Sequence, residues 1–241
     1  MTTRDKRSHN GDGHRKRLKE RFLKNGLQGF HDYEVLELLL SLNTPRKDCK
    51  QSAKHLLNRF KSFQAVLEAD VTQLSEIKGV GPANSLGIRL IKEVSDRYLE
   101  RRIHSKDVVS NPEELKAYLD HIIGHKNKEL FAAVFLDAKN KVVASEILFQ
   151  GTLTSSSVYP REVVEATIRH HAAAVIFAHN HPSGDVEPSE SDKDITKKLV
   201  IALGFSGIIV HEHMIVGSDG VYSFAASGLI KKYNKVFEQL K

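Results

Sequence analysis

The chain has 241 residues, of which 40% are hydrophobic and 27% charged, so it is long enough to bury a core and has an ordinary globular composition. No apolar run approaches the roughly 20 residues of a membrane-spanning helix, and the basic N-terminus lacks the apolar segment of a signal peptide. The single cysteine, Cys49, excludes an internal disulfide framework and any cysteine-rich metal site. We therefore expect a cytoplasmic protein without a membrane partner.

The net charge of +6 is distributed unevenly along the chain. Residues 1–106 contain 22 Lys and Arg against 13 Asp and Glu, whereas residues 107–241 contain 14 against 17. A basic half can bind nucleic acid phosphates. A solvated helical surface accounts for the same charges, so charge alone leaves both interpretations open.

The first half of the chain is predicted to be helical. Residues 1–13 are polar and lack an apolar period, which predicts a disordered tail. Asp32 is expected to be the N-cap of a helix over residues 33–42. Further helices are expected at 14–24, 53–60, 63–67 and 86–98. Residues 14–100 are therefore predicted to form a small all-α domain, followed by a charged linker at 101–110.

The second half changes to a mixture of helices and strands. Asn111 and Pro112 are expected to cap and open a helix. Strands are predicted at 130–136 and 142–149 around a hairpin turn, with more at 174–179, 207–216 and 221–224, and helices at 162–173 and 189–203. Residues 111–241 thus predict a mixed-sheet domain, and the fold class is α/β with a small all-α domain in front.

Two histidines follow the apolar segment of the strand expected at 174–179. His179 and His181 are two residues apart, so their side chains point to the same face of a strand and can bind one ion. Asp192, in the next expected helix, offers an oxygen ligand. Three protein ligands with a fourth position left to water are typical of a catalytic zinc site. The sequence therefore predicts a zinc hydrolase.

Other histidine-containing sites do not fit this chain. Sixty residues follow His181, too few to complete a (β/α)₈ barrel of about 250 residues. A zinc deaminase needs Pro-Cys-x-x-Cys, which one cysteine excludes, and no His-Glu-x-x-His helix is present. Ser189 and Asp192 also have the spacing of a helix capping box. Their distance from the two histidines is what favours metal binding over a helix cap.

The order His-x-His, seven residues, Ser, two residues, Asp resembles the JAMM (MPN+) metallopeptidase signature, and its surroundings resemble the RadC family. The matching segments are QGTL at 150–153, YPRE at 159–162, HNHPSGD at 179–185, EHMI at 212–215 and YSF at 222–224. The resemblance is strong over about residues 110–230 and weaker over 14–100. It implies a JAMM/MPN-like fold, a zinc-dependent peptidase or isopeptidase acting on a protein or peptide, and the family's DNA-repair association.

Carried over position by position, the resemblance implies that His179, His181 and Asp192 bind Zn²⁺. It further implies that Ser189 helps to hold the oxyanion of a tetrahedral intermediate. JAMM-like domains often dimerise, so a dimer is one possible state of this chain.

The remaining JAMM residue is a glutamate at the start of the first hairpin strand, acting as the general base. Glu129 is expected to fill this role, with Glu146 on the return strand as its alternative. His213 is expected to support the ligands from behind. Asp185 is expected to do the same, with a loop-turn role as its alternative.

Gly79 and Gly81, between two expected helices, resemble a helix-hairpin-helix motif, whose backbone N–H groups contact a DNA phosphate without reading sequence. The usual lysine two residues after the proline is replaced by Asn84, with Lys78 and Arg89 as the nearby cations. The resemblance implies DNA contact through Lys78, Gly79, Gly81 and Arg89; a helix-packing or protein-docking hairpin is the alternative. A second hypothesis is therefore a DNA-binding accessory repair protein whose metal site is structural or vestigial.

Overall fold

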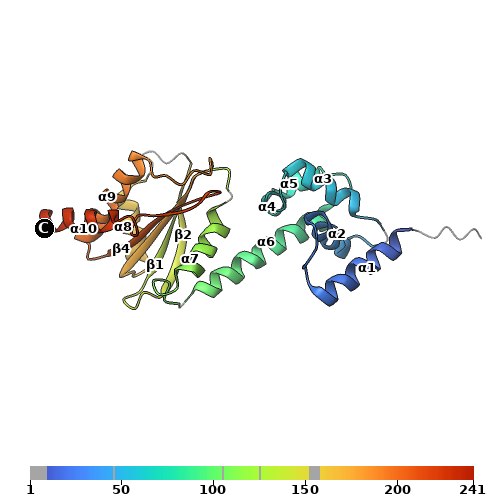
Figure 1. Ribbon diagram of the computed structural model, residues 1–241, viewed down its shortest axis with the longest axis horizontal. Coiled ribbons are helices and arrows are strands. Elements are labelled where there is room, and N and C mark those ends of the chain that lie inside the picture. Colours follow the sequence, from blue (N-terminus) through green and yellow to red (C-terminus); the bar gives the residue numbers. More distant parts are fainter. Residues whose placement is uncertain (1–9, 46, 105, 125, 152–157) are drawn as a thin grey trace, which may run out of the picture. The chain divides into compact units, whose positions relative to one another are not determined.

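The computed structural model describes residues 10–45, 47–104, 106–124, 126–151 and 158–241, with the side chains of 10–12 left out. The chain divides into two compact units, residues 1–95 and 96–241. Most of the expected disordered tail, residues 1–9, lies outside the described residues, while residues 10–13 are already helical. Figure 1 shows the helices of the first unit and the sheet of the second.

The N-terminal unit is built from short helices around one apolar core. Leu36, Leu56 and Ile88, from three different helices, are fully buried in it. Burying such side chains stabilises a small helical unit by about 1.5–3 kcal/mol each. The helices are α1 (Asn10–Asn25), α2 (Asp32–Asn43), α3 (Lys50–Phe60), α4 (Phe63–Glu68), α5 (Val71–Ser75) and the first part of α6 (Pro82–Ile103).

Two helix ends in this region differ from the expectation. His31, not Asp32, is the N-cap of α2, because the Glu34 carboxylate reaches back to the His31 N–H at 3.0 Å and closes the turn one residue earlier. The helix expected at 86–98 is longer at both ends, since Pro82 opens α6 and its basic last turn runs to Ile103. The charged segment expected as a linker therefore begins inside α6.

The C-terminal unit contains a five-stranded sheet with the order β2-β1-β3-β4-β5. The β3–β4 pair is parallel, and the other three pairs are antiparallel. Helix α9 (Glu190–Phe205) connects the two parallel strands, as such a crossover requires. The strands are β1 (Leu130–Leu136), β2 (Val142–Gln150), β3 (Ala174–Asn180), β4 (Ile209–Gly217) and β5 (Gly220–Ser223).

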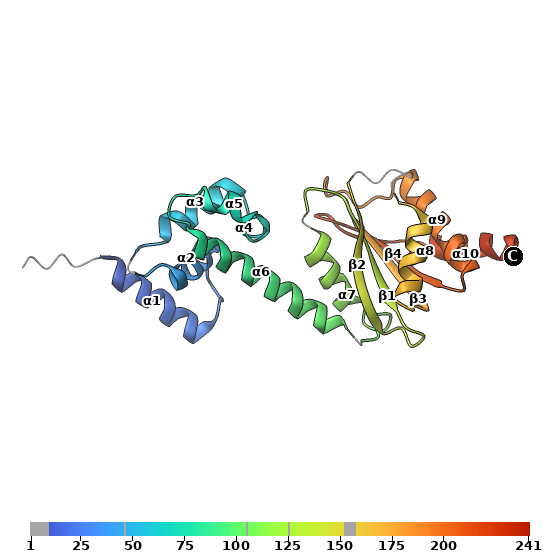
Figure 2. The ribbon, with the colours of Figure 1, turned by 180° about the vertical axis from the view of Figure 1, so that it is seen from behind.

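Helices cover both faces of this sheet (Figure 2). One face packs on α8 (Pro160–Arg169), α9 and α10 (Leu229–Leu240), and the other on α7 (Pro112–Leu119) and the π-helical turn η1 (Asp120–Gly124). In β3, Val175 and Phe177 face the first set of helices and Ile176 and Ala178 the second, as the alternation of a strand dictates. The next residue in this alternation, His179, therefore faces α8, α9 and α10.

The predicted fold class is confirmed: a mixed-sheet α/β domain follows a small helical domain along the chain. Helix α8 ends at Arg169, earlier than expected, because the chain turns at His171 with a φ of 51° to enter β3. Helix α10 was not predicted, although it buries Ile230, Tyr233 and Phe237. Within the described residues, every helix is too short or too polar to cross a membrane.

Candidate metal centre

Four side chains that can bind metal meet at the carboxyl end of β3. They are Glu129, His179, His181 and Asp192, and one potential ligand atom from each lies within 4.8 Å of all the others. The two histidine Nε2 atoms are 3.1 Å apart. The Asp192 carboxylate lies 3.3 Å from the Nε2 of His179 and 3.5 Å from that of His181. His179 and Asp192 are buried, while Glu129 and His181 are partly exposed.

The sheet register explains why Glu129, just before β1, joins a cluster built on β3. The two strands are antiparallel with Phe131 opposite His179, so continuing the register places Glu129 opposite His181. The side chain of Asn180, fully buried at the end of β3, holds this approach segment in place. It accepts the Leu130 N–H at 2.7 Å and donates to the carbonyls of Lys126 and Lys128, each at 3.1 Å.

The alternative general base, Glu146, lies elsewhere. It pairs with Ala133 in the middle of β2 and forms ion pairs with Arg169 and His170, both at 2.7 Å. The structure therefore brings Glu129, and not Glu146, to the two histidines.

The His181 ring is oriented by the loop that follows it. Its Nδ1 lies 2.7 Å from the backbone carbonyl of Asp185. Because a carbonyl only accepts hydrogen bonds, Nδ1 carries the proton, and in the neutral ring Nε2 presents a lone pair to the cluster. The Asp185 carboxylate instead accepts the Glu187 N–H at 2.9 Å, a turn contact. Asp185 thus supports His181 through its backbone, and its side chain has the turn role.

Gly184 allows this loop to approach the turn between β4 and β5. It has a φ of 91°, and a Cβ there would lie 2.2 Å from Ser218 Oγ. Across the contact, a Cβ on Gly217 would lie 2.3 Å from the Gly184 carbonyl oxygen. Two glycines are therefore needed for the loop to position the Asp185 carbonyl at His181.

His179 is supported from behind by His213 on β4, which is fully buried. His179 Nδ1 lies 2.8 Å from His213 Nε2, and His213 Nδ1 lies 2.6 Å from the hydroxyl of Thr196 on α9. Burial lowers the pKa of His213 well below its usual value, and the neighbouring His179 lowers it further. His213 thus has the supporting position that the sequence predicts, whereas Thr196 was not predicted.

Ser189 and Asp192 form a capping box and belong to the cluster at the same time. Ser189 is the N-cap of α9; its hydroxyl and backbone N–H donate to Asp192 Oδ2 at 2.6 and 2.8 Å. The Asp192 N–H in turn donates to Ser189 Oγ at 3.2 Å. The cap thus holds the carboxylate toward the histidines, and the two interpretations of this pair are compatible.

The cluster favours positive charge. Burial alone would raise the pKa of the Asp192 carboxyl, but hydrogen bonds with His179, His181 and Ser189 outweigh it and hold that pKa far below its usual range. The hydrogen bond with Asp192 raises the pKa of His181, against the effect of burial, and the Asp185 carbonyl adds to the increase. A carboxylate that stays ionised beside two imidazoles is a site that a cation neutralises.

The distances in the cluster fit a tetrahedral metal ion. Bonds of about 2.0–2.2 Å, as zinc makes to His and Asp, separate neighbouring ligand atoms by about 3.3–3.6 Å in a tetrahedron. His179 Nε2 lies 3.1 Å from His181 Nε2 and 3.3 Å from Asp192 Oδ1, close to these values, and the 3.5 Å contact of His181 is with the other carboxylate oxygen, Oδ2. Imidazole and carboxylate ligands suit zinc and other first-row transition metals. The residues present therefore fit a transition-metal ion.

The residues expected to contact DNA lie in the N-terminal unit. The turn between α5 and α6 forms as the motif predicts, with Gly79 at a φ of 88°. Arg89, however, forms an ion pair with Glu93 at 2.6 Å, while Lys78 is exposed. Asn84 is buried and donates to Thr44 Oγ1 at 2.7 Å, so it serves helix packing. Gly81, the last of the four residues expected to contact DNA, accepts a hydrogen bond from the Asn84 N–H through its backbone carbonyl.

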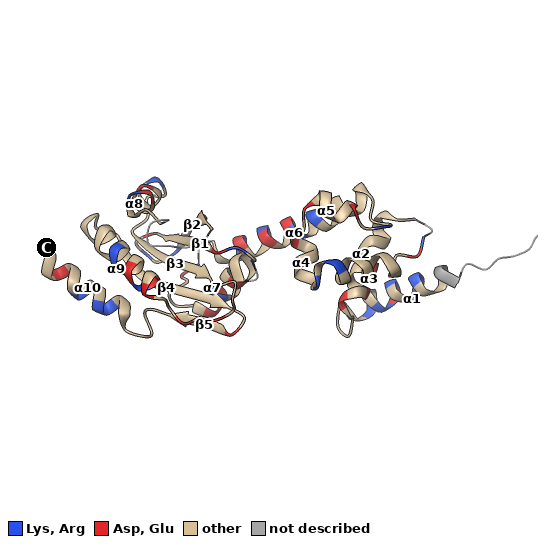
Figure 3. Ribbon diagram, turned by 90° about the horizontal axis from the view of Figure 1, so that it is seen from above, with Lys and Arg blue, Asp and Glu red and all other residues tan. Residues whose placement is uncertain are grey.

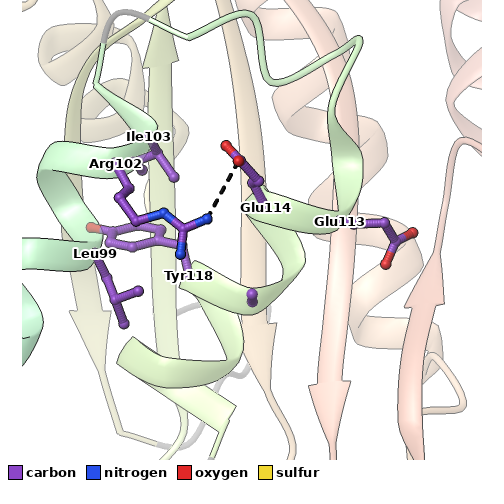
Figure 4. Close-up of a pocket in the computed structure, with 7 residues that line it drawn as sticks. Leu99, Arg102, Ile103, Glu113, Glu114 and Tyr118 are labelled. Atoms are coloured by element: carbon purple, nitrogen blue, oxygen red, sulfur yellow. Dashed lines mark hydrogen bonds and ion pairs between the residues drawn. The ribbon is translucent and has the colours of Figure 1, made fainter.

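A separate cavity of the C-terminal unit lies between the end of α6 and α7 (Figure 4). Leu99, Ile103 and Tyr118 contribute its apolar walls, and Arg102 crosses it to Glu114 at 3.5 Å. None of the four cluster residues lines this cavity.

Comparison with known proteins accounts for nearly the whole chain. Residues 109–229 match the RadC-like JAB domain family, and residues 13–86 match the UPF0758 N-terminal family. A UPF0758 protein of Nitrosospira multiformis is 42% identical over 214 residues, covering 89% of this chain and 96% of the relative. UPF0758 proteins of a Janthinobacterium species and of Ruegeria pomeroyi are 40% and 39% identical, covering 88% and 90% of this chain and 95% and 97% of the relatives.

The matched ranges include both regions that the sequence singled out. The RadC-like JAB range contains all four cluster residues together with Asn180, Thr196 and His213, and the N-terminal range contains Gly79, Gly81 and Asn84. In the segment 150–153, Thr152 and Leu153 lie outside the described residues. The chain therefore belongs to the UPF0758 family and carries a RadC-like JAB domain.

Proposed function

We propose that this protein is a zinc-dependent hydrolase of amide bonds, a peptidase or isopeptidase acting on a protein or peptide. The observation that carries the proposal is the cluster of His179, His181, Asp192 and Glu129 at the end of β3. His179, His181 and Asp192 would hold the ion. When bound, zinc would supply Lewis acidity, polarising a carbonyl group and lowering the pKa of water toward about 7.

Glu129 is the proposed general base. It is a partly exposed carboxylate within 4.8 Å of the other potential ligand atoms, so it can reach both solvent and a bound substrate. Its carboxylate would take a proton from the attacking water and deliver it to the leaving amine. Asn180 contributes by holding the backbone on both sides of Glu129.

Ser189 is the proposed donor to the oxyanion. Its hydroxyl donates to Asp192 Oδ2 at 2.6 Å, and the residue is exposed at the first turn of α9. Turned from Asp192 toward a substrate, the same hydroxyl would stabilise the charge that develops on the carbonyl oxygen.

The test uses a library of synthetic peptides, linear and lysine-branched, incubated with the zinc-loaded protein, with new termini identified by mass spectrometry. We expect cleavage by the wild type and by Glu146→Gln, since Glu146 lies outside the cluster. Glu129→Gln should retain zinc and lose cleavage by about 10²–10⁴-fold, the contribution of a general base. No cleavage by the wild type, or equal cleavage by Glu129→Gln, would overturn the proposal.

A second proposed function is DNA association through the N-terminal unit. Helix α1 supports it, because Lys16, Arg17 and Lys24 are exposed there and residues 1–106 carry the basic excess of the chain. Figure 3 shows the Lys and Arg positions of α1 in blue. We expect binding to a DNA duplex that weakens steeply with salt and weakens further in Lys16→Glu with Arg17→Glu. The same double substitution at Lys231 and Lys232 on α10 is the control. No binding at low salt, or equal loss in both variants, would contradict this proposal.

A further inference from the structure

A chain of hydrogen bonds leads from the metal cluster into the core and back to the cluster. It runs from His179 Nδ1 to His213 Nε2 at 2.8 Å, and from His213 Nδ1 to Thr196 Oγ1 at 2.6 Å. The Thr196 hydroxyl then donates to the backbone carbonyl of Asp192. His179, His213 and Thr196 are all fully buried, so solvent cannot replace any of these contacts.

The backbone carbonyl of Asp192, at the end of this series of hydrogen bonds, sets the direction of each of them. A carbonyl only accepts, so the single hydroxyl proton of Thr196 points to Asp192. Toward His213 the hydroxyl must then accept, which places the proton of the neutral His213 ring on Nδ1 and leaves its Nε2 as an acceptor. His179 must therefore donate from Nδ1, so in the neutral ring the lone pair lies on Nε2, the nitrogen that faces the cluster.

The surroundings of His213 favour this neutral form. The ring lies among Phe131, Phe177 and Phe224, with ring centroids at 5.4, 6.1 and 4.9 Å. An imidazolium in this apolar setting would have lost its hydration without gaining a carboxylate partner. A doubly protonated His213 would also donate to His179 and leave no lone pair on His179 Nε2.

We propose that His213 and Thr196 are positioning residues that fix the Nδ1–H tautomer of His179 and tie its ring to the backbone of Asp192. This inference rests on the proposed metal site. It attributes part of the metal affinity of that site to His213 and Thr196, neither of which is a proposed ligand. His181 reaches the same tautomer by a single bond to the Asp185 carbonyl, in a partly exposed loop. The buried His179 obtains it through the two-residue relay.

Thr196 offers a clean substitution with a matched control. Thr196→Val keeps the branched shape and removes the hydroxyl, and Thr196→Ser keeps the hydroxyl. Thr167 on α8 is also fully buried and also donates to a helix carbonyl, that of Val164 at 2.7 Å, but it takes no part in the relay. Thr167→Val therefore reports the cost of losing a buried hydroxyl elsewhere in the same unit.

The first readout is the Zn²⁺ affinity of the full-length protein, measured by competition with a chromophoric chelator. We expect Thr196→Val to bind zinc about 10–100-fold more weakly, the usual effect of removing a partner behind a ligand. Thr196→Ser and Thr167→Val should stay close to the wild type. Wild-type affinity in Thr196→Val, or an equal loss in Thr167→Val, would overturn the proposal.

The second readout is the tautomer of His179 in the metal-free wild type, read from the ¹⁵N shifts of its ring nitrogens. We expect a proton on Nδ1 in the wild type, and a mixture of tautomers in Thr196→Val. A wild-type ring without a proton on Nδ1 would overturn the relay without any variant having to fold. A wild type that shows the expected tautomer but binds no zinc would instead refute the metal site alone.

Discussion

Asn180 holds the backbone on both sides of Glu129. Its side chain satisfies three backbone groups of the segment that leads into β1, and it is fully buried. Asn180→Ala would leave these groups unsatisfied, so we expect it to lower the free energy of unfolding by about 1–3 kcal/mol. Urea denaturation measures this, with the exposed Asn234→Ala on α10 as control. Equal stability of the two variants would contradict the assigned role.

Gly79 and Gly81 are equivalent in the sequence motif but not in the structure. Gly79 has a φ of 88°, and a Cβ there would lie 2.3 Å from Ser52 Oγ, whereas a Cβ on Gly81 would meet nothing within 4 Å. We expect Gly79→Ala to destabilise the protein by at least about 1–2 kcal/mol and Gly81→Ala to change its stability by less than about 0.5 kcal/mol. Thermal denaturation with DNA absent checks this. A larger loss in Gly81→Ala would refute the distinction.

For single residues, the sequence predicts a site position where neighbouring residues of the same strand or helix determine it. His179 and His181 share a strand face, and Asp192 follows at a fixed helix position, so their meeting can be predicted from spacing. Asn180 and Thr196 could not be assigned in this way, because Asn180 bonds to the segment that leads into β1 and Thr196 contacts His213 on β4. One signal was available for Thr196: it interrupts the buried apolar face of α9 four residues after Asp192.

Among the elements, α1 and α2 are joined by ion pairs. Arg21 on α1 forms an ion pair with the buried Glu34 of α2 at 2.7 Å. Burial would raise the pKa of Glu34, but the hydrogen bond from the His31 N–H and the ion pair with Arg21 outweigh it, so the pKa is lowered. The charged carboxylate is therefore the form that stabilises the folded unit.

The sign of the pH dependence follows from this lowered pKa. The contribution of Glu34 is fully present above the unfolded carboxyl pKa of about 4.3 and is lost as pH falls through the lower folded value. We expect Glu34→Gln to reduce the loss of stability between about pH 5 and pH 3. Glu20→Gln, on an exposed pair with Lys16 at 3.9 Å, is the control. Identical pH profiles for the wild type and Glu34→Gln would rule out this linkage.

The elements themselves were largely predictable from apolar periodicity and turn residues, and their pairing was not. The hairpin of β1 and β2 has a local turn, but the β1–β3 register depends on residues about fifty positions apart. That register is what distinguishes Glu129 from Glu146, and the sequence left the two as alternatives. Helix α10 was missed because its apolar residues find their partners only when it packs on α9; there, a Cβ on Gly204 would lie 3.1 Å from the Phe237 ring.

For the molecule as a whole, the two units differ in the functional groups that they carry. The N-terminal unit carries the basic excess, and the C-terminal unit carries the cluster that could hold a metal ion, within its RadC-like JAB domain. The proposed hydrolase activity and the relay behind His179 both depend on a metal ion bound in that cluster. Metal binding is thus the property on which both depend.

The most direct measurement is the zinc content of the purified full-length protein after incubation with Zn²⁺ and removal of free metal. Asp192→Ala and Asp194→Ala, prepared identically, form a matched pair on α9, because Asp194 is exposed and pairs only with Lys198 among its described contacts. We expect one zinc per chain in the wild type and in Asp194→Ala, and none in Asp192→Ala. A wild type that stays empty, or an Asp192→Ala that retains as much zinc as Asp194→Ala, would contradict the account.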